Sequence, residues 1–146
     1  KIAKDIPTAN KLMLDTINNG IALNKFEEII NAQNGDITSL ISGQFIPKHE
    51  IIIKSNGNGF ISSMETEKIG WSLVEMGCGR KLEKDALDYT AGIEFLKKIG
   101  TKVTKGEPLY RIFGNNPKKM ANAKRILEKT YILKEVEISK PELIIN

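Results

Sequence analysis

The length, composition and charge of this chain already limit what it can be. It has 146 residues with a net charge of +4, of which 40% are hydrophobic and 27% charged, and these ordinary globular values exclude a disordered tail. The single cysteine, Cys78, excludes an internal disulfide framework and indicates a reducing compartment, so we predict a cytoplasmic protein. No apolar run approaches the roughly 18 residues of a membrane span, and the N-terminus lacks both a signal peptide and an initiator Met. We therefore interpret the chain as part of a longer protein.

The first third of the chain predicts two short amphipathic helices. One begins at Pro7-Thr8 and ends at Asn18-Asn19-Gly20, and the second is capped by Asn24 and closed by Asn34-Gly35. Two helices of this length bury too little surface to be stable alone, so we expect a larger body to cover their apolar faces. The segment Ser42–Pro47 then predicts a linker.

From His49 onward the sequence alternates between strand and helix patterns. Glu50–Lys54 predicts a buried strand, and the Asn-Gly pairs of Asn56–Gly59 predict a hairpin turn to a return strand, Phe60–Met64. Thr66 is expected to cap a helix that ends at Gly77, where glycine gives access to a positive φ.

The rest of the chain continues this mixture of elements. Asn116-Pro117 predicts the start of another helix, with Tyr131 as the last residue of its apolar face. Strands are expected in the remaining segments, namely Tyr89–Leu96, the stretch between Gly100 and Gly106, Leu109–Ile112 and Lys134–Ile138, before Pro141 opens an extended tail. The elements do not follow a strict βαβ rhythm, which indicates an α+β fold.

Few residues of this sequence suggest catalysis. His49 is the only histidine, and one Cys and one His 29 positions apart are far below a Cys–His nucleophile motif, so Cys78 is expected to pack as a small residue. The ligands are also too few for a zinc site, and we predict no metal. The carboxylates Glu83, Asp85 and Asp88 alternate with basic residues, which favours local ion pairs or helix-start charges over acid–base catalysis.

Two Gly-x-Gly triplets occur, Gly57-Asn58-Gly59 and Gly77-Cys78-Gly79. Neither continues into the dinucleotide-binding fingerprint, and no Walker-type lysine follows. Arg80, directly after the second triplet, has two interpretations: it neutralises a bound anion, or it holds the loop by pairing with Asp85 or Asp88. We favour the structural role.

Positive charge is concentrated in the C-terminal part. Residues 47–146 carry 18 basic and 13 acidic side chains, and ten Lys and Arg residues fall between Lys97 and Lys129 against only Glu107 and Glu128. Such a block can attract nucleic acid. Tyr110 and the nearby Phe113 are too few for base stacking, so a solvated lysine-rich face is the preferred interpretation and nucleic acid is not an expected partner.

The pattern Gly100-x-x-Val103-x-x-Gly106-x-x-Leu109 is the most specific local motif. It is similar to the "hammerhead" turn of biotinyl and lipoyl carrier domains, in which glycines form sharp corners and the Val and Leu point inward. A carrier also needs a lysine between two methionines, and no Met-Lys-Met occurs here. The motif therefore predicts a barrel-sandwich-like fold element, and a carrier or binding module remains the alternative function.

Several motifs in order resemble the C-terminal region of the thymidine/pyrimidine-nucleoside phosphorylases. They are Gly77-Cys78-Gly79-Arg80, then Asp85-x-x-Asp88-x-x-x-Gly92, then Gly100 to Leu109. Upstream, Ala22–Asp36 is similar to the segment that closes the family's helical and α/β domains. Glu75, Cys78 and the tail Pro141-Glu142-Leu143-Ile144 look more like the branch shared with archaeal AMP phosphorylases.

This resemblance implies a reaction for the parent enzyme, a pentosyltransferase. In the family, phosphate attacks C1′ of a pyrimidine nucleoside and releases the free base and (deoxy)ribose 1-phosphate, and positioning and cationic side chains carry the catalysis. The family's phosphate loop and pyrimidine-binding residues lie in its helical and α/β domains, and this sequence contains neither. The resemblance thus implies no catalytic residue here, no cofactor beyond phosphate as co-substrate, and an inactive fragment of a homodimeric parent.

The resemblance also implies a domain organisation. Residues 1–46 would be the helical end of the preceding α/β domain, which is the expected partner, and residues 47–146 the small C-terminal domain with its hammerhead. The loop carrying Gly77, Gly79, Arg80, Asp85 and Asp88 would help to close the inter-domain cleft over the nucleoside.

Overall fold

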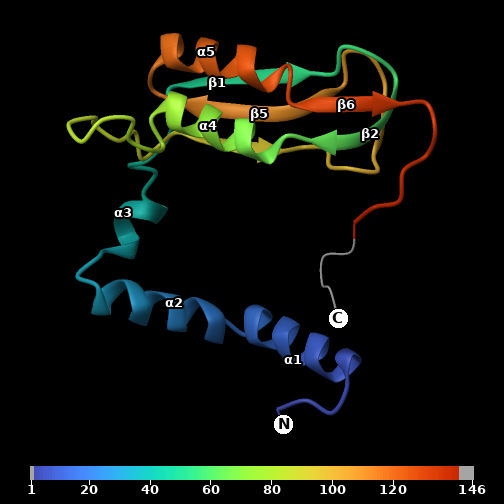
Figure 1. Cartoon of the computed structure of the whole chain (residues 1–146). Coiled ribbons are helices and arrows are strands. Elements are labelled where there is room, and N and C mark those ends of the chain that lie inside the picture. Colours follow the sequence, from blue (N-terminus) through green and yellow to red (C-terminus); the bar gives the residue numbers. More distant parts are fainter. Residues whose placement is uncertain (1, 142–146) are drawn as a thin grey trace. The chain divides into compact units, whose positions relative to one another are not determined.

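A computed structural model describes residues 2–141 of the chain, so the tail residues Glu142, Leu143 and Ile144 lie outside the described residues. The chain divides into two compact units, Lys1–Phe45 and Ile46–Asn146 (Figure 1). The assignment of the first unit to an α/β domain stays a prediction. No helix within residues 2–141 is both long and apolar enough to cross a membrane.

The first unit is helical. Its elements are α1 (Ile6–Asn18), α2 (Ile21–Ala32) and a short α3 (Ile37–Ile41) that the sequence did not suggest. The predicted cap at Asn24 is wrong, because Gly20, with φ +80°, already precedes α2 and Asn24 lies inside the helix. None of the residues in these three helices is buried.

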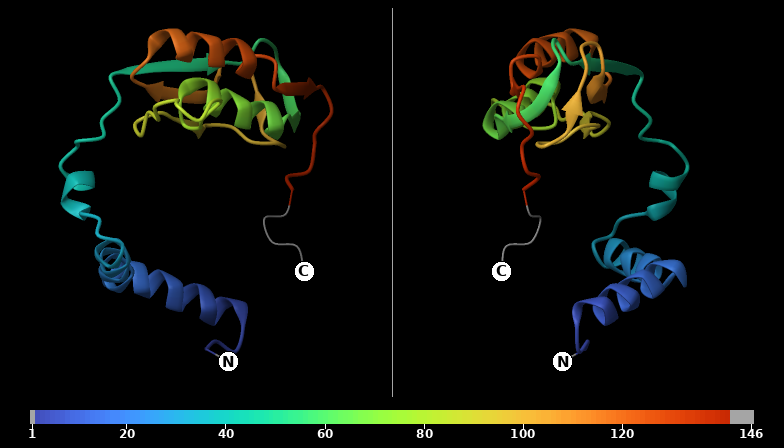
Figure 2. Two further views of the ribbon diagram at one scale, coloured as in Figure 1. Left: turned by 60° about the vertical axis from the view of Figure 1, so that its left-hand side comes forward. Right: turned by 90° about the vertical axis from the view of Figure 1, so that its right-hand side faces the viewer.

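Within residues 46–141, the second unit combines two three-stranded antiparallel sheets with two helices, which confirms the α+β class. The first sheet has the order β1-β5-β3 and the second the order β4-β2-β6. Their bounds are β1 His49–Lys54, β2 Gly59–Met64, β3 Gly92–Phe95, β4 Lys102–Val103, β5 Pro108–Gly114 and β6 Tyr131–Lys134. The helices are α4 (Thr66–Met76) and α5 (Pro117–Leu127), which pack against each other (Figure 2).

The two sheets and two helices share one hydrophobic core. The side chains of Leu109, Tyr110 and Ile112 are fully buried, at 0% exposure, on β5, the central strand of the first sheet. Buried residues from the other elements complete it: Ile53, Ile61, Ile69, Met76, Val103, Met120, Ala123, Leu127 and Tyr131. This unit therefore has its own core, which helices α1–α3 lack among the described residues.

The predicted hairpin at Asn56–Gly59 is wrong. β1 pairs with β5 and β2 pairs with β4 and β6, so this turn carries the chain from one sheet to the other. The turn pairs instead with residues 104–107: the amide of Gly106 donates to the carbonyl of Ser55 at 2.8 Å, and that of Lys105 donates to Asn58 Oδ1 at 2.7 Å. The Asn-Gly pairs predict a turn correctly, but they do not predict which strands pair with each other.

Three helix and strand boundaries also differ from expectation. Glu65, not Thr66, is the N-cap residue of α4, although the C-terminal stop at Gly77 is confirmed with φ +103°. Tyr131 does not extend α5, because the helix ends at Leu127 and Tyr131 opens β6 opposite Met64. The strand predicted over 134–138 is therefore shifted: it spans Tyr131–Lys134 and ends where it was expected to begin.

The motif from Gly100 to Leu109 has the geometry that its sequence predicted. Gly100 and Gly106 both have positive φ, at +82° and +87°, and bracket the short strand β4. Val103 and Leu109 are buried, at 1% and 0% exposure. The hammerhead itself stays a prediction from the resemblance.

We expect Gly59→Ala to destabilise the second unit strongly. Gly59 has φ +145°, and a Cβ there would lie 2.7 Å from the carbonyl oxygen of Lys134 on the paired strand β6. Backbone strain and this clash together should lower the free energy of unfolding by about 2–3 kcal/mol. Gly57→Ala is the matched control, because its Cβ would make only ordinary contact with Leu133 at 3.4 Å. Urea unfolding compares the two variants, and equal losses would contradict the strain argument.

Candidate functional site

The segment between α4 and β3, residues 77–91, is here called the glycine-arginine loop. It leaves α4 at Gly77, whose positive φ lets the amide of Cys78 donate to the carbonyl of Leu73 at 3.0 Å. Gly79 packs closely against the helix, since a Cβ at this position would lie 3.0 Å from Val74 Cγ2. Both glycines therefore allow the loop to fold back onto α4.

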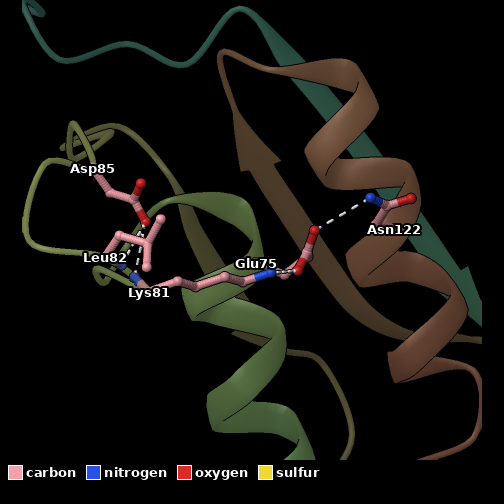
Figure 3. Close-up of polar contacts among 5 residues, drawn as sticks. All are labelled: Glu75, Lys81, Leu82, Asp85 and Asn122. Atoms are coloured by element: carbon pink, nitrogen blue, oxygen red, sulfur yellow. Dashed lines mark hydrogen bonds and ion pairs between the residues drawn. The ribbon is translucent and has the colours of Figure 1, made fainter.

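Asp85 organises the first half of the loop. Its Oδ2 accepts the backbone N–H groups of Lys81 and Leu82, both at 2.9 Å (Figure 3). These two amides hold the pKa of the Asp85 carboxyl below its usual value. Asp85 thus acts as an acceptor for backbone donors rather than as a partner for the basic side chains around it.

Asp88 organises the second half. Its Oδ1 accepts the backbone N–H of Thr90 at 3.0 Å and its hydroxyl at 2.6 Å, and its Oδ2 accepts the backbone N–H of Asn115 at 2.8 Å. Burial alone would raise the pKa of this carboxyl, but the hydrogen bonds from Thr90 and Asn115 outweigh it and lower the pKa. Asp88 therefore joins the loop to the end of β5.

Glu75 on α4 connects three elements. It forms an ion pair with Lys81 of the loop and accepts a hydrogen bond from Asn122 Nδ2 on α5 at 3.2 Å (Figure 3). Lys81 and then Asn122 lower the pKa of the Glu75 carboxyl, whose side chain is 19% exposed. The ionised Glu75 stabilises the contact between the loop and both helices.

A pocket of about 450 Å³ lies beside this ion pair. Its lining residues come from α4, the loop and α5: Val74, Glu75, Gly79, Lys81, Leu82, Asp85 and Lys119. Two lysines and two carboxylates face each other there, so the pocket shows no excess of either charge. It does not by itself define an anion site.

The structure does not support the local interpretation of Arg80. Arg80 is exposed, and neither Asp85 nor Asp88 accepts a bond from it, because their oxygens accept from backbone groups and from Thr90. The expectation of ion pairs between the acidic cluster and its interleaved bases is wrong for Asp85 and Asp88 for the same reason, and Lys81 of the loop forms its ion pair with Glu75 instead. Gly77, Gly79, Asp85 and Asp88 shape a loop from which Arg80 projects.

Cys78 does not have the features of an activated nucleophile. Its Sγ donates to the carbonyl oxygen of Ala91 at 3.2 Å. The residue is exposed, so the expectation that it packs as a small residue is wrong. Partial burial of the sulfur, and then the negative charge of Asp88, still raises the pKa of this thiol and disfavours the reactive thiolate. His49 opens β1 in an exposed position. Within residues 2–141, no three His, Cys, Asp or Glu side chains gather closely enough to hold a metal ion.

Part of the basic block is engaged with carboxylates. Lys97 pairs with Glu107 at 2.7 Å, and Arg111 lies between Glu50 at 2.8 Å and Glu94 at 2.6 Å across the first sheet. These pairs reduce the charge that the block presents to a polyanion.

Sequence reasoning missed the residues on which the loop rests. Glu75 lies just before the loop in sequence, whereas Asn115, Lys119 and Asn122 are brought beside it only by the fold. One sequence signal was available, since Asn115 stands directly before the N-cap residue Asn116 of α5. The hydrogen-bond partner of a polar residue between a strand and a helix depends on which strands pair, so the neighbouring sequence does not predict it.

Comparisons with known proteins now place this domain. The family described as "Pyrimidine nucleoside phosphorylase C-terminal domain" matches residues 60–134, about half of the chain. The pyrimidine-nucleoside phosphorylase of Staphylococcus aureus strain USA300 is 34% identical over 115 residues, covering 77% of this chain and 27% of that protein. The corresponding protein of Staphylococcus epidermidis strain ATCC 35984 is 32% identical over the same share of each chain.

These matches first define a class: α+β domains of nucleoside phosphorylases, which are pentosyltransferases. The chain belongs to the pyrimidine nucleoside phosphorylase C-terminal domain family. It spans little more than a quarter of the length of the curated relatives that it matches. The matches do not support the carrier alternative or the AMP phosphorylase branch.

The hydrogen bonds of Asp88 predict an acid-sensitive loop. A carboxyl whose pKa is lowered by folding stabilises the protein fully above its unfolded pKa of about 4, and this stabilisation is lost as the pH falls through the lower folded value. We expect Asp88→Asn to reduce the free energy of unfolding at pH 7 by about 1–2 kcal/mol, because charge-assisted hydrogen bonds are lost.

The difference between wild type and Asp88→Asn should start to shrink below a pH of about 4, where the carboxyl of the unfolded chain takes up a proton, and should be lost as the pH falls through the lower pKa of the folded carboxyl. Urea unfolding at a series of pH values from about 7 to below about 4 measures this difference in the free energy of unfolding. Glu83→Gln is the control, because Glu83 is exposed in the same loop. A difference that stays constant to low pH would show that the charge of Asp88 is not what stabilises the loop.

Proposed function

We propose that this chain is the C-terminal part of an enzyme that catalyses the phosphorolysis of thymidine and other pyrimidine nucleosides to the free base and (deoxy)ribose 1-phosphate. The observation that carries the proposal is the similarity over 77% of the chain to proteins named pyrimidine-nucleoside phosphorylase. Phosphate is the co-substrate, no other cofactor is required, and the parent enzyme works in the cytoplasm as a homodimer.

Within that enzyme, we assign the second unit to closure of the cleft rather than to chemistry. The glycine-arginine loop supports this role, because its backbone is fixed from within by Asp85 and Asp88 while Arg80 is left exposed. A loop held by these bonds that presents an exposed guanidinium can form a charge-assisted contact in one domain arrangement only, and such a contact shifts the equilibrium towards that arrangement.

The first unit supports the proposal through its exposed apolar side chains. Leu12, Ile17 and Phe26 are 43%, 64% and 47% exposed on helices α1 and α2. Helices with no buried residue gain little stability from their own packing. We infer that they complete the α/β domain of the parent enzyme.

The full-length protein containing this sequence tests the proposal. It should release free base from thymidine or uridine only when phosphate is present, and form (deoxy)ribose 1-phosphate in equal amount. Activity on AMP with none on the nucleosides would assign the chain to the AMP phosphorylase variant. Absence of phosphorolysis with all three substrates would overturn the proposal.

A further inference from the structure

Asn115 links two segments that are far apart in sequence. Its backbone N–H donates to Asp88 Oδ2 at 2.8 Å, and its side-chain Nδ2 approaches Asp88 Oδ1 at 3.4 Å, so it holds the second half of the glycine-arginine loop. Its Oδ1 accepts the backbone N–H of Lys48 at 3.1 Å. One side chain therefore contacts both the loop and the residue directly before β1.

Lys48 occupies a particular place in the chain. It follows the predicted linker Ser42–Pro47, and the second unit begins only two residues earlier, at Ile46. The next residue, His49, already pairs with Gly114 in the first sheet. The hydrogen bond from Lys48 to Asn115 thus lies where the connecting segment enters the second unit, directly before the first strand pair.

Gly114, the residue directly before Asn115, packs closely against the loop. A Cβ at Gly114 would lie 3.2 Å from Ala91 Cβ and 3.5 Å from Asp88 Oδ2. The loop is closed further by two backbone hydrogen bonds, from Asp88 to the carbonyl of Gly77 at 2.9 Å and from Ala91 to the carbonyl of Asp88 at 3.1 Å. A change at Asn115 therefore acts directly on the residue that closes the loop.

We propose that Asn115 and Asp88 are positioning residues that couple the glycine-arginine loop to the connecting segment at Lys48. When the segment holds the Lys48 N–H against Asn115 Oδ1, the Asn115 side chain is fixed and the loop stays closed on β5. When the segment moves away, the side chain is released and the loop opens more often. The functional meaning of this coupling rests on the proposed role of the loop in cleft closure.

The substitution Lys48→Pro isolates the decisive hydrogen bond, because proline lacks the backbone N–H while the rest of the network is retained. Lys48→Ala is the matched control, since it removes the side chain and keeps the N–H. Amide hydrogen exchange of the 146-residue chain gives the readout. We expect Lys48→Pro to increase exchange about five-fold at the loop amides of Asp88, Thr90 and Ala91, and Lys48→Ala to leave it unchanged.

A merely structural role for Lys48 would give a different pattern. It would raise exchange throughout the second unit, including the core amides where β1 pairs with β5, whereas the coupling raises exchange in the loop and leaves the core unchanged. A rise that is confined to β1, or that is equal for both Lys48 variants, overturns the proposal.

A second variant tests whether Asn115 transmits the effect. Asn115→Ala removes the acceptor for Lys48 but keeps the backbone N–H that donates to Asp88. It should raise loop exchange as much as Lys48→Pro, and the double variant should show no further increase. Additive effects overturn the coupling, and Asn115→Ala decides the question alone if Lys48→Pro does not fold.

These exchange measurements need no substrate, so they are independent of the proposed function. Exchange that follows the expected pattern, together with a full-length enzyme indifferent to loop substitutions, would keep the coupling and reject cleft closure. Exchange that does not follow this pattern, together with a full-length enzyme that is slowed by loop substitutions, would reject the coupling and keep the role of the loop in closure.

Discussion

The 146-residue chain alone is expected to release no base from thymidine or uridine above the background of the buffer. The family resemblance implies that the phosphate loop and the pyrimidine-binding residues lie in parts that this sequence does not contain, and the chain covers only 27% of the relative from Staphylococcus aureus. Phosphorolysis depends on positioning phosphate and nucleoside against cationic groups. Without these groups, the expected loss of activity relative to the full-length enzyme is complete.

The measurement is the release of free base from each nucleoside with and without phosphate, with the full-length protein as the positive control. Circular dichroism and a cooperative unfolding transition first establish that the purified chain is folded, since its second unit has a core of its own. Phosphate-dependent turnover by the folded chain would contradict the assignment of all catalytic residues to the missing parts.

The fold was predictable at several positions where a local signal decides the structure. Gly77 ends α4 with a positive φ, Asn116 caps α5 through the amide of Lys119, and Gly100 and Gly106 form the two corners around β4. Each of these positions depends on backbone conformations or caps that few residue types allow. A few consecutive residues are therefore enough to predict such features.

Strand pairing was not predictable in the same way. Asn56–Gly59 has the composition of a hairpin turn, yet β1 pairs with β5 some sixty positions away, at His49 opposite Gly114. Polar groups of this turn form hydrogen bonds with residues far away in sequence, including the bond from the Lys105 amide to Asn58 Oδ1. Local turn chemistry cannot distinguish a hairpin from a crossing between sheets when both use the same residues.

The start of β6 was misplaced for a related reason. Tyr131 continues the apolar spacing of Met120, Ala123 and Leu127, which favours a longer helix. The helix ends at Leu127 instead, and Thr130 fixes the turn that follows: it is fully buried, its hydroxyl donates to the carbonyl of Leu127 at 2.8 Å, and it contacts Tyr110 Oη at 3.2 Å. A tertiary contact thus overrides the helical period.

The candidate loop was partly predictable. Its glycines and carboxylates were identified, but the carboxylates were expected to pair with basic side chains and bind backbone amides instead. The sequence shows where the carboxylates are, whereas the conformation of the loop decides which hydrogen-bond donors contact them. Glu75 and Asn115 contact the loop only through the packing of α4, α5 and β5.

Arg80→Ala is expected to slow phosphorolysis by the full-length enzyme about five- to hundredfold, while the unfolding of the 146-residue chain hardly changes. Arg80 is exposed and its neighbours Asp85 and Asp88 bind other donors, so its removal costs the isolated domain no contact with them. If Arg80 forms a charge-assisted hydrogen bond across the cleft only in the closed enzyme, its loss shifts the equilibrium towards the open form by roughly 1–3 kcal/mol.

Two further variants make the measurement specific. Arg80→Lys keeps the charge but not the planar fork of donors, and should recover only part of the activity. Lys84→Ala removes another exposed cation of the same loop and should leave the rate near that of the wild type. Reduced stability of the isolated chain together with unchanged kinetics of the full-length enzyme would restrict Arg80 to a local structural role, because a contact made only on closure must affect turnover and not the folding of the separate domain.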